Sequence, residues 1–162
     1  MAVELDVGQA VLLRPGEGEA VADLPEKTLL LLVDHEALAL TWFRYPAHED
    51  GPERHIHKTH TDAFYVLSGE VSFRVGPDET HVVRGTAGTF VAAPTGVVHT
   101  FANESSADTT FLNIHAPNAG FADMLRARRD GRHRDADRFD QHSPPADGGK
   151  PLSEVIVVLP GE

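Results

Sequence analysis

Short apolar runs separated by turn residues are the feature of this sequence that most limits its fold. Over roughly the first 115 residues, short stretches alternate apolar and polar side chains or are apolar throughout, as in β-strands. Gly, Pro and Asp stand between the stretches and indicate turns. The pattern is typical of a β-sandwich or β-barrel. It predicts strands over residues 11–14, 28–33, 37–45, 63–67, 71–75, 81–84, 89–92, 97–101 and 110–115. The run 28–33 is almost wholly apolar, which indicates a strand buried on both faces.

The chain changes character after residue 115. Apolar residues at helical spacing predict a short helix over 118–129, with Asn118 as its N-cap. Residues 130–149 are polar and rich in Pro and Gly, which indicates an extended loop. The apolar segment 154–159 predicts a terminal strand that needs an edge to pair with, on its own barrel or on a neighbouring subunit. We expect a single domain over 1–162, with its barrel at about 28–115 and an extension over 116–162.

Composition narrows the chemistry that the chain can carry. It has no cysteine, so any metal must be held by His, Asp or Glu. The formal net charge of −11 repels nucleic acid and anionic membranes, and we expect neither as a partner. No apolar run approaches the roughly 20 residues of a membrane helix, and the N-terminus does not have the layout of a signal peptide. We therefore expect a cytoplasmic protein.

Several histidines fall in a pattern that suits a metal ion. His55 and His57 lie two apart, so on a strand both imidazoles point to the same side. Asp62 follows at the start of the next predicted strand, and His99 comes much later. Three imidazoles and one carboxylate suit one divalent transition metal (Fe, Mn, Ni, Co, Cu or Zn) and suit Mg or Ca poorly.

Two spaced motifs surround these histidines. They run His55-x-His57-x4-Asp62-x6-Gly69 and Gly88-x5-Pro94-x-Gly96-x2-His99-x3-Asn103. They resemble the two signature segments of the cupin superfamily, the second at each of its defining positions. The resemblance covers about residues 28 to 115. It implies an all-β fold, the cupin double-stranded β-helix or jelly-roll barrel, here with a short C-terminal helix and a terminal strand. It also implies a metal held by His55, His57 and His99.

The fourth ligand stays open, because cupins of this type usually carry Glu where this chain has the shorter Asp62. Asp62 is our first assignment, directly or through a water. His60 is the second and would give a four-histidine site, and a site with only three protein ligands is the third. As catalytic residues we expect Asp62, which could take a proton from the substrate, and His115 as a general base. The alternative for His115 is a structural, hydrogen-bonded role.

The segment after the barrel suggests a reaction. Residues 115–121 resemble the Pro-Gly-Phe segment that follows the barrel in quercetin-dioxygenase-like single-domain (cupin_2-like) cupins, with Asn118 and Ala119 as an interruption. The resemblance implies a metal-dependent dioxygenase acting on an aromatic or phenolic, flavonol-like small molecule. Phe121, Met124 and Leu125 would then cover the pocket as a partial lid. The alternative is a helix packed outside the sheet.

Two other functions stay open. One is a sugar isomerase or epimerase, for which a pocket lined by Arg44 and Arg74 would indicate a charged substrate. The other is a non-catalytic module that binds a small molecule or a metal. Small cupins commonly pair, so we expect a homodimer with a small-molecule substrate as its other partner.

Overall fold

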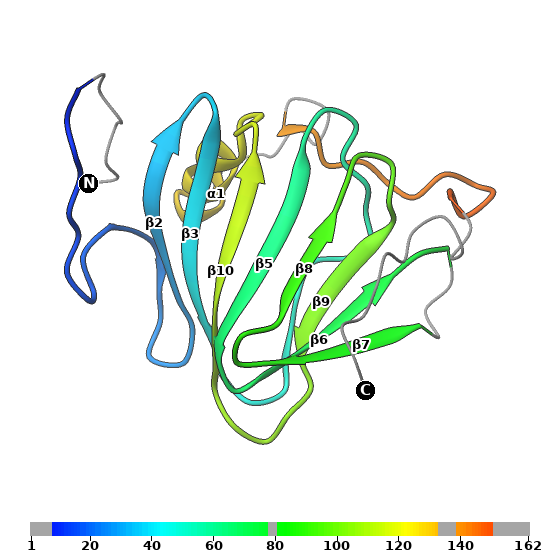
Figure 1. Cartoon of the computed structure of the whole chain (residues 1–162), viewed down its shortest axis with the longest axis horizontal. Coiled ribbons are helices and arrows are strands. Elements are labelled where there is room, and N and C mark those ends of the chain that lie inside the picture. The colour runs from blue at the N-terminus through cyan, green and yellow to red at the C-terminus, as the bar shows by residue number, and fades with distance from the viewer. Residues whose placement is uncertain (1–7, 78–80, 133–138, 151–162) are drawn as a thin grey trace.

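The computed structural model describes residues 8–77, 81–132 and 139–150, and these residues form two antiparallel sheets and a helix (Figure 1). In chain order the elements are β1 (Glu19–Asp23), β2 (Thr28–His35), β3 (Leu38–Tyr45), β4 (Glu49–Asp50), β5 (Thr61–Ser68), β6 (Glu70–Val75), β7 (Val82–Thr86), β8 (Phe90–Ala93), β9 (His99–Asn103), β10 (Thr109–Ala116) and α1 (Phe121–Arg129). The larger sheet has the order β1-β2-β3-β10-β5-β8, and the smaller has the order β4-β9-β6-β7.

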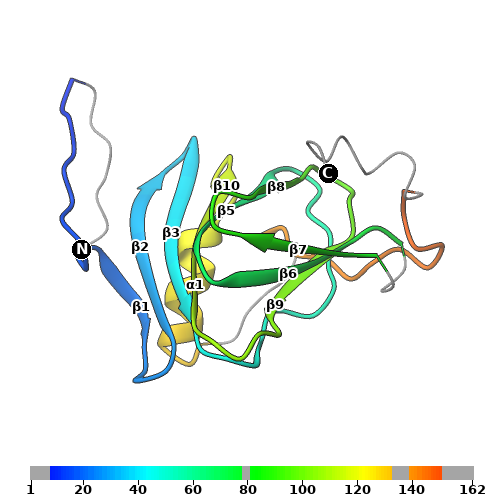
Figure 2. The same ribbon diagram turned by 60° about the horizontal axis from the view of Figure 1, so that its bottom comes forward.

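The core lies between the two sheets, which face each other (Figure 2). Aromatic rings from both sheets meet there. Phe64 of β5 lies 5.1 Å from Phe73 of β6 and 4.9 Å from Phe101 of β9, measured between ring centroids. Phe43 and Phe111, on neighbouring strands of the larger sheet, pack edge to face at 5.1 Å. The predicted all-β jelly-roll barrel is confirmed.

The hairpin between β5 and β6 depends on Gly69. Its φ of 72° lies in the left-handed region, which favours glycine. A Cβ at this position would lie 2.5 Å from the carbonyl oxygen of Asp108, closer than packed atoms allow. The motif glycine is therefore required by both backbone conformation and space.

The N-terminal part differs from the prediction. Residues 11–14 form no strand, and Leu12 is 80% exposed, so that prediction was wrong. The first strand is β1, which pairs with β2 from Glu19 opposite Leu31 to Asp23 opposite Thr28. The sequence pattern missed it because small alanines weaken its alternation.

β2 is covered on one face only. Leu29 and Leu31 are buried, whereas Leu30 and Leu32 on the opposite face are partly exposed. The prediction of a strand buried on both faces was therefore wrong for the described part of the chain. The outward side of β2 is therefore apolar and only partly covered at Leu30 and Leu32.

The C-terminal helix begins at Phe121, three residues later than predicted. Gly120 occupies the N-cap position in a left-handed conformation, with φ 83°, and makes no side-chain cap bond. Asn118 contributes from just outside, because its Oδ1 accepts a hydrogen bond from the backbone N–H of Ala122 at 3.2 Å. The predicted strand 154–159 lies outside the described residues. Within the described ranges, no helix is long and apolar enough to cross a membrane.

Candidate metal centre

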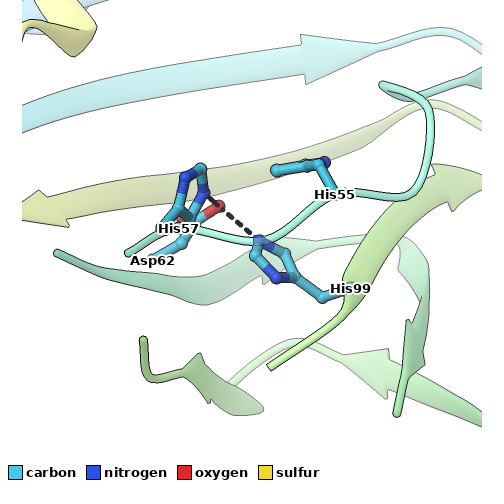
Figure 3. Close-up of side chains that lie close together, drawn as sticks. All are labelled: His55, His57, Asp62 and His99. Atoms are coloured by element: carbon cyan, nitrogen blue, oxygen red, sulfur yellow. Dashed lines mark hydrogen bonds and ion pairs between the residues drawn. The ribbon is translucent and has the colours of Figure 1, made fainter. Parts of the chain in front are cut away.

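Three histidines and one aspartate converge inside the barrel (Figure 3). His55 pairs with His99 in an isolated antiparallel bridge, which places the segment before β5 beside the start of β9. His57 follows on the same face, and Asp62 projects inward from β5. Ligand atoms of these residues all lie within 4.8 Å of one another. Each residue is at most 5% exposed, so the cluster is withdrawn from solvent.

The backbone fixes the tautomer of all three imidazoles. The Nδ1 atoms of His55, His57 and His99 lie 2.7, 2.7 and 2.9 Å from main-chain carbonyl oxygens of Glu53, Asp140 and Val97, respectively. A carbonyl oxygen only accepts, so each Nδ1 must carry the hydrogen. In a neutral ring the lone pair is then on Nε2. A hydrogen bond from the other ring nitrogen is the usual way in which proteins orient metal-binding histidines.

The resulting nitrogen lone pairs and the carboxylate charge of Asp62 make the cluster suitable for binding a cation. Nε2 of His99 lies 3.2 Å from Oδ2 of Asp62, and Nε2 of His57 lies 3.6 Å from the same oxygen. Nε2 of His57 is buried without a hydrogen-bond partner among the described residues. Burial lowers the pKa of His55 to about 3, which keeps this ring neutral. Neutral nitrogen lone pairs around a carboxylate oxygen suit a divalent transition metal.

Asp62 is ionised in this setting. Burial by itself would raise its pKa, but the electrostatic influence of His115 and the close ring nitrogens of His57 and His99 hold the pKa well below its usual range. Its other oxygen, Oδ1, accepts a hydrogen bond from the Asn113 side-chain amide. The carboxylate is therefore held in place and negatively charged, as a metal ligand must be.

Known proteins resemble the barrel that carries this cluster. Residues 41–115 match the family model described as Cupin domain. Over these residues the chain is similar to a cupin domain. Similar solved structures include KdgF from Halomonas sp., at 16% identity and a TM-score of 0.57, covering 67% of this chain and 94% of that one. The polyketide cyclase RemF from Streptomyces resistomycificus has 21% identity and a TM-score of 0.55, over 67% of this chain and 80% of that one.

A third solved structure is a sugar phosphate isomerase from a cupin superfamily of Silicibacter pomeroyi. It has 19% identity and a TM-score of 0.50, and the match covers 57% of this chain and 60% of that one. At these identities the likeness shows the cupin fold alone. No curated protein matches the sequence at a significant level.

His60, the rival fourth ligand, uses both ring nitrogens elsewhere. Its Nδ1 donates to Oδ2 of Asp140 at 2.7 Å, and its Nε2 lies 2.7 Å from Nδ1 of His115. It lies within a second possible ligand group, with His57 and His115. The structure thus brings Asp62, and not His60, into the group that holds all three motif histidines. Which of them binds a metal stays a prediction.

His115 is both hydrogen-bonded and exposed to the cavity. Its Nε2 donates to Oδ1 of Asn113 at 3.0 Å and lies 3.4 Å from Oδ1 of Asp62. Its ring stacks on Phe121, with the centroids 3.5 Å apart and the planes at 10°. Burial lowers the pKa of His115 to about 3 and also lowers that of His60, so burial favours the uncharged form of each ring.

A narrow cavity of about 40 Å³ lies against the ligand cluster. Its apolar walls include Leu29, Phe43, Phe101, Phe121, Met124 and Leu125. Arg128 and Gln141 also line it. The residues of α1 therefore line the pocket, as the lid hypothesis predicted, and the alternative of a helix packed only outside the sheet was wrong. A larger cavity of about 280 Å³ adjoins it and shares His55, Met124 and Gln141 with it.

Two contributors to the site were missed from the sequence. Asp140 and Gln141 belong to the segment 130–149, which we had predicted to be an extended loop. Part of this segment instead forms a bridge, in which Ile56 and His142 exchange two backbone hydrogen bonds of 3.0 Å. No periodic pattern in the sequence predicts such a contact, because a single bridge needs only one residue in extended conformation.

Proposed function

We propose that this cupin is a metal-dependent enzyme that acts on a small aromatic or phenolic molecule, and that its reaction is a dioxygenation. The observation that carries the proposal is the position of the ligand cluster, which opens onto a cavity with aromatic and aliphatic walls. Such walls favour a flat, largely uncharged ring over a heavily hydrated sugar. The adjoining larger cavity leaves room for the rest of the molecule.

The residues of the cluster suit this chemistry. A divalent transition metal held by His55, His57, His99 and Asp62 would supply Lewis acidity and redox chemistry toward O₂. The protein orients the substrate and keeps water out of the site. Phe43 and Phe101 hold the substrate ring from the barrel side, and Phe121 of α1 covers it and excludes water.

Removal of a hydroxyl proton is the step that this chain's own groups perform. Asp62 lines the cavity, its Oδ1 accepts a hydrogen bond from the Asn113 amide, and we assign the uptake of this proton to its carboxylate. His115 lines the same cavity and is the second candidate. The contact of His115 with His60, and of His60 with Asp140, offers the proton a path away from the substrate.

The two arginines expected to line a pocket for a charged sugar do not line these cavities, whereas Arg54 lines the larger cavity and Arg128 the narrow one. Arg44 pairs with Asp108 at 3.3 Å, Arg74 pairs with Glu104, and neither arginine lines the two cavities described above. The solved cupins similar to this one include both an isomerase and a cyclase, so the fold does not choose between reactions.

O₂ uptake tests the proposal. The chain is loaded in turn with Fe, Mn, Co, Ni, Cu and Zn, and O₂ consumption is followed with flavonols and catechols. We expect consumption that needs both a metal and a phenol and that falls at least about 100-fold in His99→Ala, because a ligand is lost. The variant His35→Ala, whose histidine lies at the end of β2 and outside the ligand cluster, should behave as wild type.

Absence of uptake with every metal would remove the dioxygenase proposal. Isomerisation of a sugar by the same samples would favour the alternative enzyme. Tight metal binding without turnover of any of these compounds would favour a binding module.

A further inference from the structure

Asp140 lies outside the matched cupin segment, 41–115, yet it makes the densest set of hydrogen bonds near the ligand cluster. Asp140 is only 7% exposed to solvent. Its φ of 52° is left-handed, a conformation that few residues other than glycine, asparagine and aspartate adopt at low cost. An uncommon backbone conformation at a buried carboxylate indicates a specific role.

The side chain of Asp140 holds the loop that joins His57 to β5. Oδ2 accepts hydrogen bonds from the backbone N–H of Thr59 at 2.8 Å, from its hydroxyl at 2.7 Å and from Nδ1 of His60 at 2.7 Å. Oδ1 accepts from the backbone N–H of Lys58 at 2.9 Å and from Nε2 of His142 at 3.0 Å. The carboxylate therefore fixes consecutive residues directly after a metal-ligand candidate.

The main chain of Asp140 acts on the ligand itself. Its carbonyl oxygen accepts the Nδ1 hydrogen of His57 at 2.7 Å, which leaves the His57 lone pair on Nε2. The other two motif histidines are bound by carbonyls only two residues away from them, Glu53 and Val97. His57 alone among the three depends on a carbonyl 83 residues distant in sequence.

We propose that Asp140 is a positioning residue for the metal centre, which acts by clamping the loop of residues 58–60 and by orienting the ring of His57. The inference rests on the proposed metal site but not on the proposed reaction. Removing an interaction that orients a ligand typically weakens metal binding by about 10- to 100-fold.

The test uses the full-length chain with Asp140→Asn, which has nearly the same size and tolerates the left-handed backbone. An amide has one acceptor oxygen where the carboxylate has two, so part of the clamp is lost. Asp147→Asn is the control, because Asp147 is an exposed residue of the same segment. Dissociation constants for Zn²⁺ and Co²⁺ are measured by competition with a chelator. Nitrogen NMR shifts of the metal-free protein report which nitrogen of His57 carries hydrogen.

We expect Asp140→Asn to weaken metal binding at least about 10-fold and to mix the tautomers of His57, with Asp147→Asn unchanged. A variant that stays folded and binds metal within two-fold of wild type would overturn the positioning role, and so would a wild type that binds neither metal. Metal binding that responds as expected, in a protein without O₂ uptake, would overturn the reaction and keep the role of Asp140.

Discussion

β5 and β10 supply inward side chains to both ends of the barrel interior, and the two ends differ in chemistry. At one end Val66 lies opposite Phe111, within the apolar core. At the other end Asp62 lies opposite His115, in the ligand cluster. Alternation along a strand decides only which face a side chain occupies. The position along the strand decides whether that side chain stabilises the fold or serves the site.

This comparison predicts that stability and metal binding can be altered separately, and the largest effect belongs to the core end. Phe111→Ala should lower the free energy of unfolding by about 3–5 kcal/mol, because it removes a fully buried ring. Denaturation by urea measures it. Metal affinity of the folded variant should stay within two-fold of wild type, and a parallel loss of affinity would show that the two ends are coupled.

At the other end, His99→Ala should weaken metal binding by at least about 100-fold, because one of three imidazole ligands is lost. Its metal-free form should be destabilised less than Phe111→Ala, since the lone pairs around Asp62 no longer oppose one another. Metal content after dialysis and chemical denaturation give the two values. Unchanged metal content would contradict the assignment of His99.

The next largest effect concerns the fourth ligand, Asp62 or His60. Asp62→Asn should weaken metal binding by about 10-fold or more, because the negative charge is lost from the cluster. His60→Ala should have a smaller effect, since His60 contacts Asp140 and His115. Elemental analysis of both variants, purified without added metal or chelator, decides between them. Metal loss only in His60→Ala would make His60 the ligand.

The smallest effect should come from a modest change of pH. Burial lowers the pKa of His55 and His115 from 6.5 to about 3, so between these values the unfolded chain binds more protons than the folded one. Stability of the metal-free protein should therefore fall as pH falls below about 6.5. Calorimetry should show a Tm lower by a few degrees at pH 6 than at pH 7. A Tm that rises toward pH 6 would contradict this.

The sequence predicted most of the barrel, because alternation and turn residues are local signals. β6 and β10 were found within one residue at each end. The motif histidines were found from the two spaced segments around them, although His55 lies in an isolated bridge and His57 in no named strand. Residues 11–14 show the limit of such signals, because an apolar run becomes a strand only where an edge accepts it.

Asp140 could not be predicted in this way. Its partners His57 and His60 lie about 80 residues earlier in the sequence. Only folding brings them together, and no periodic pattern predicts such a contact. Its left-handed φ also has no reliable mark in the sequence, since aspartate is common in ordinary turns. The sequence therefore predicted the candidate ligands of the cluster but not Asp140, which holds them in place.

The carbonyl contacts of the three motif histidines have a consequence for how this protein tolerates change. Glu53, Val97 and Asp140 all contribute through the peptide unit, which every amino acid possesses. A replaced side chain at Glu53 or Val97 leaves the acceptor in place, so imidazole orientation is buffered against mutation there. A redesign of the larger cavity, which Glu53 lines, can therefore change the Glu53 side chain and keep the orientation of the His55 ring.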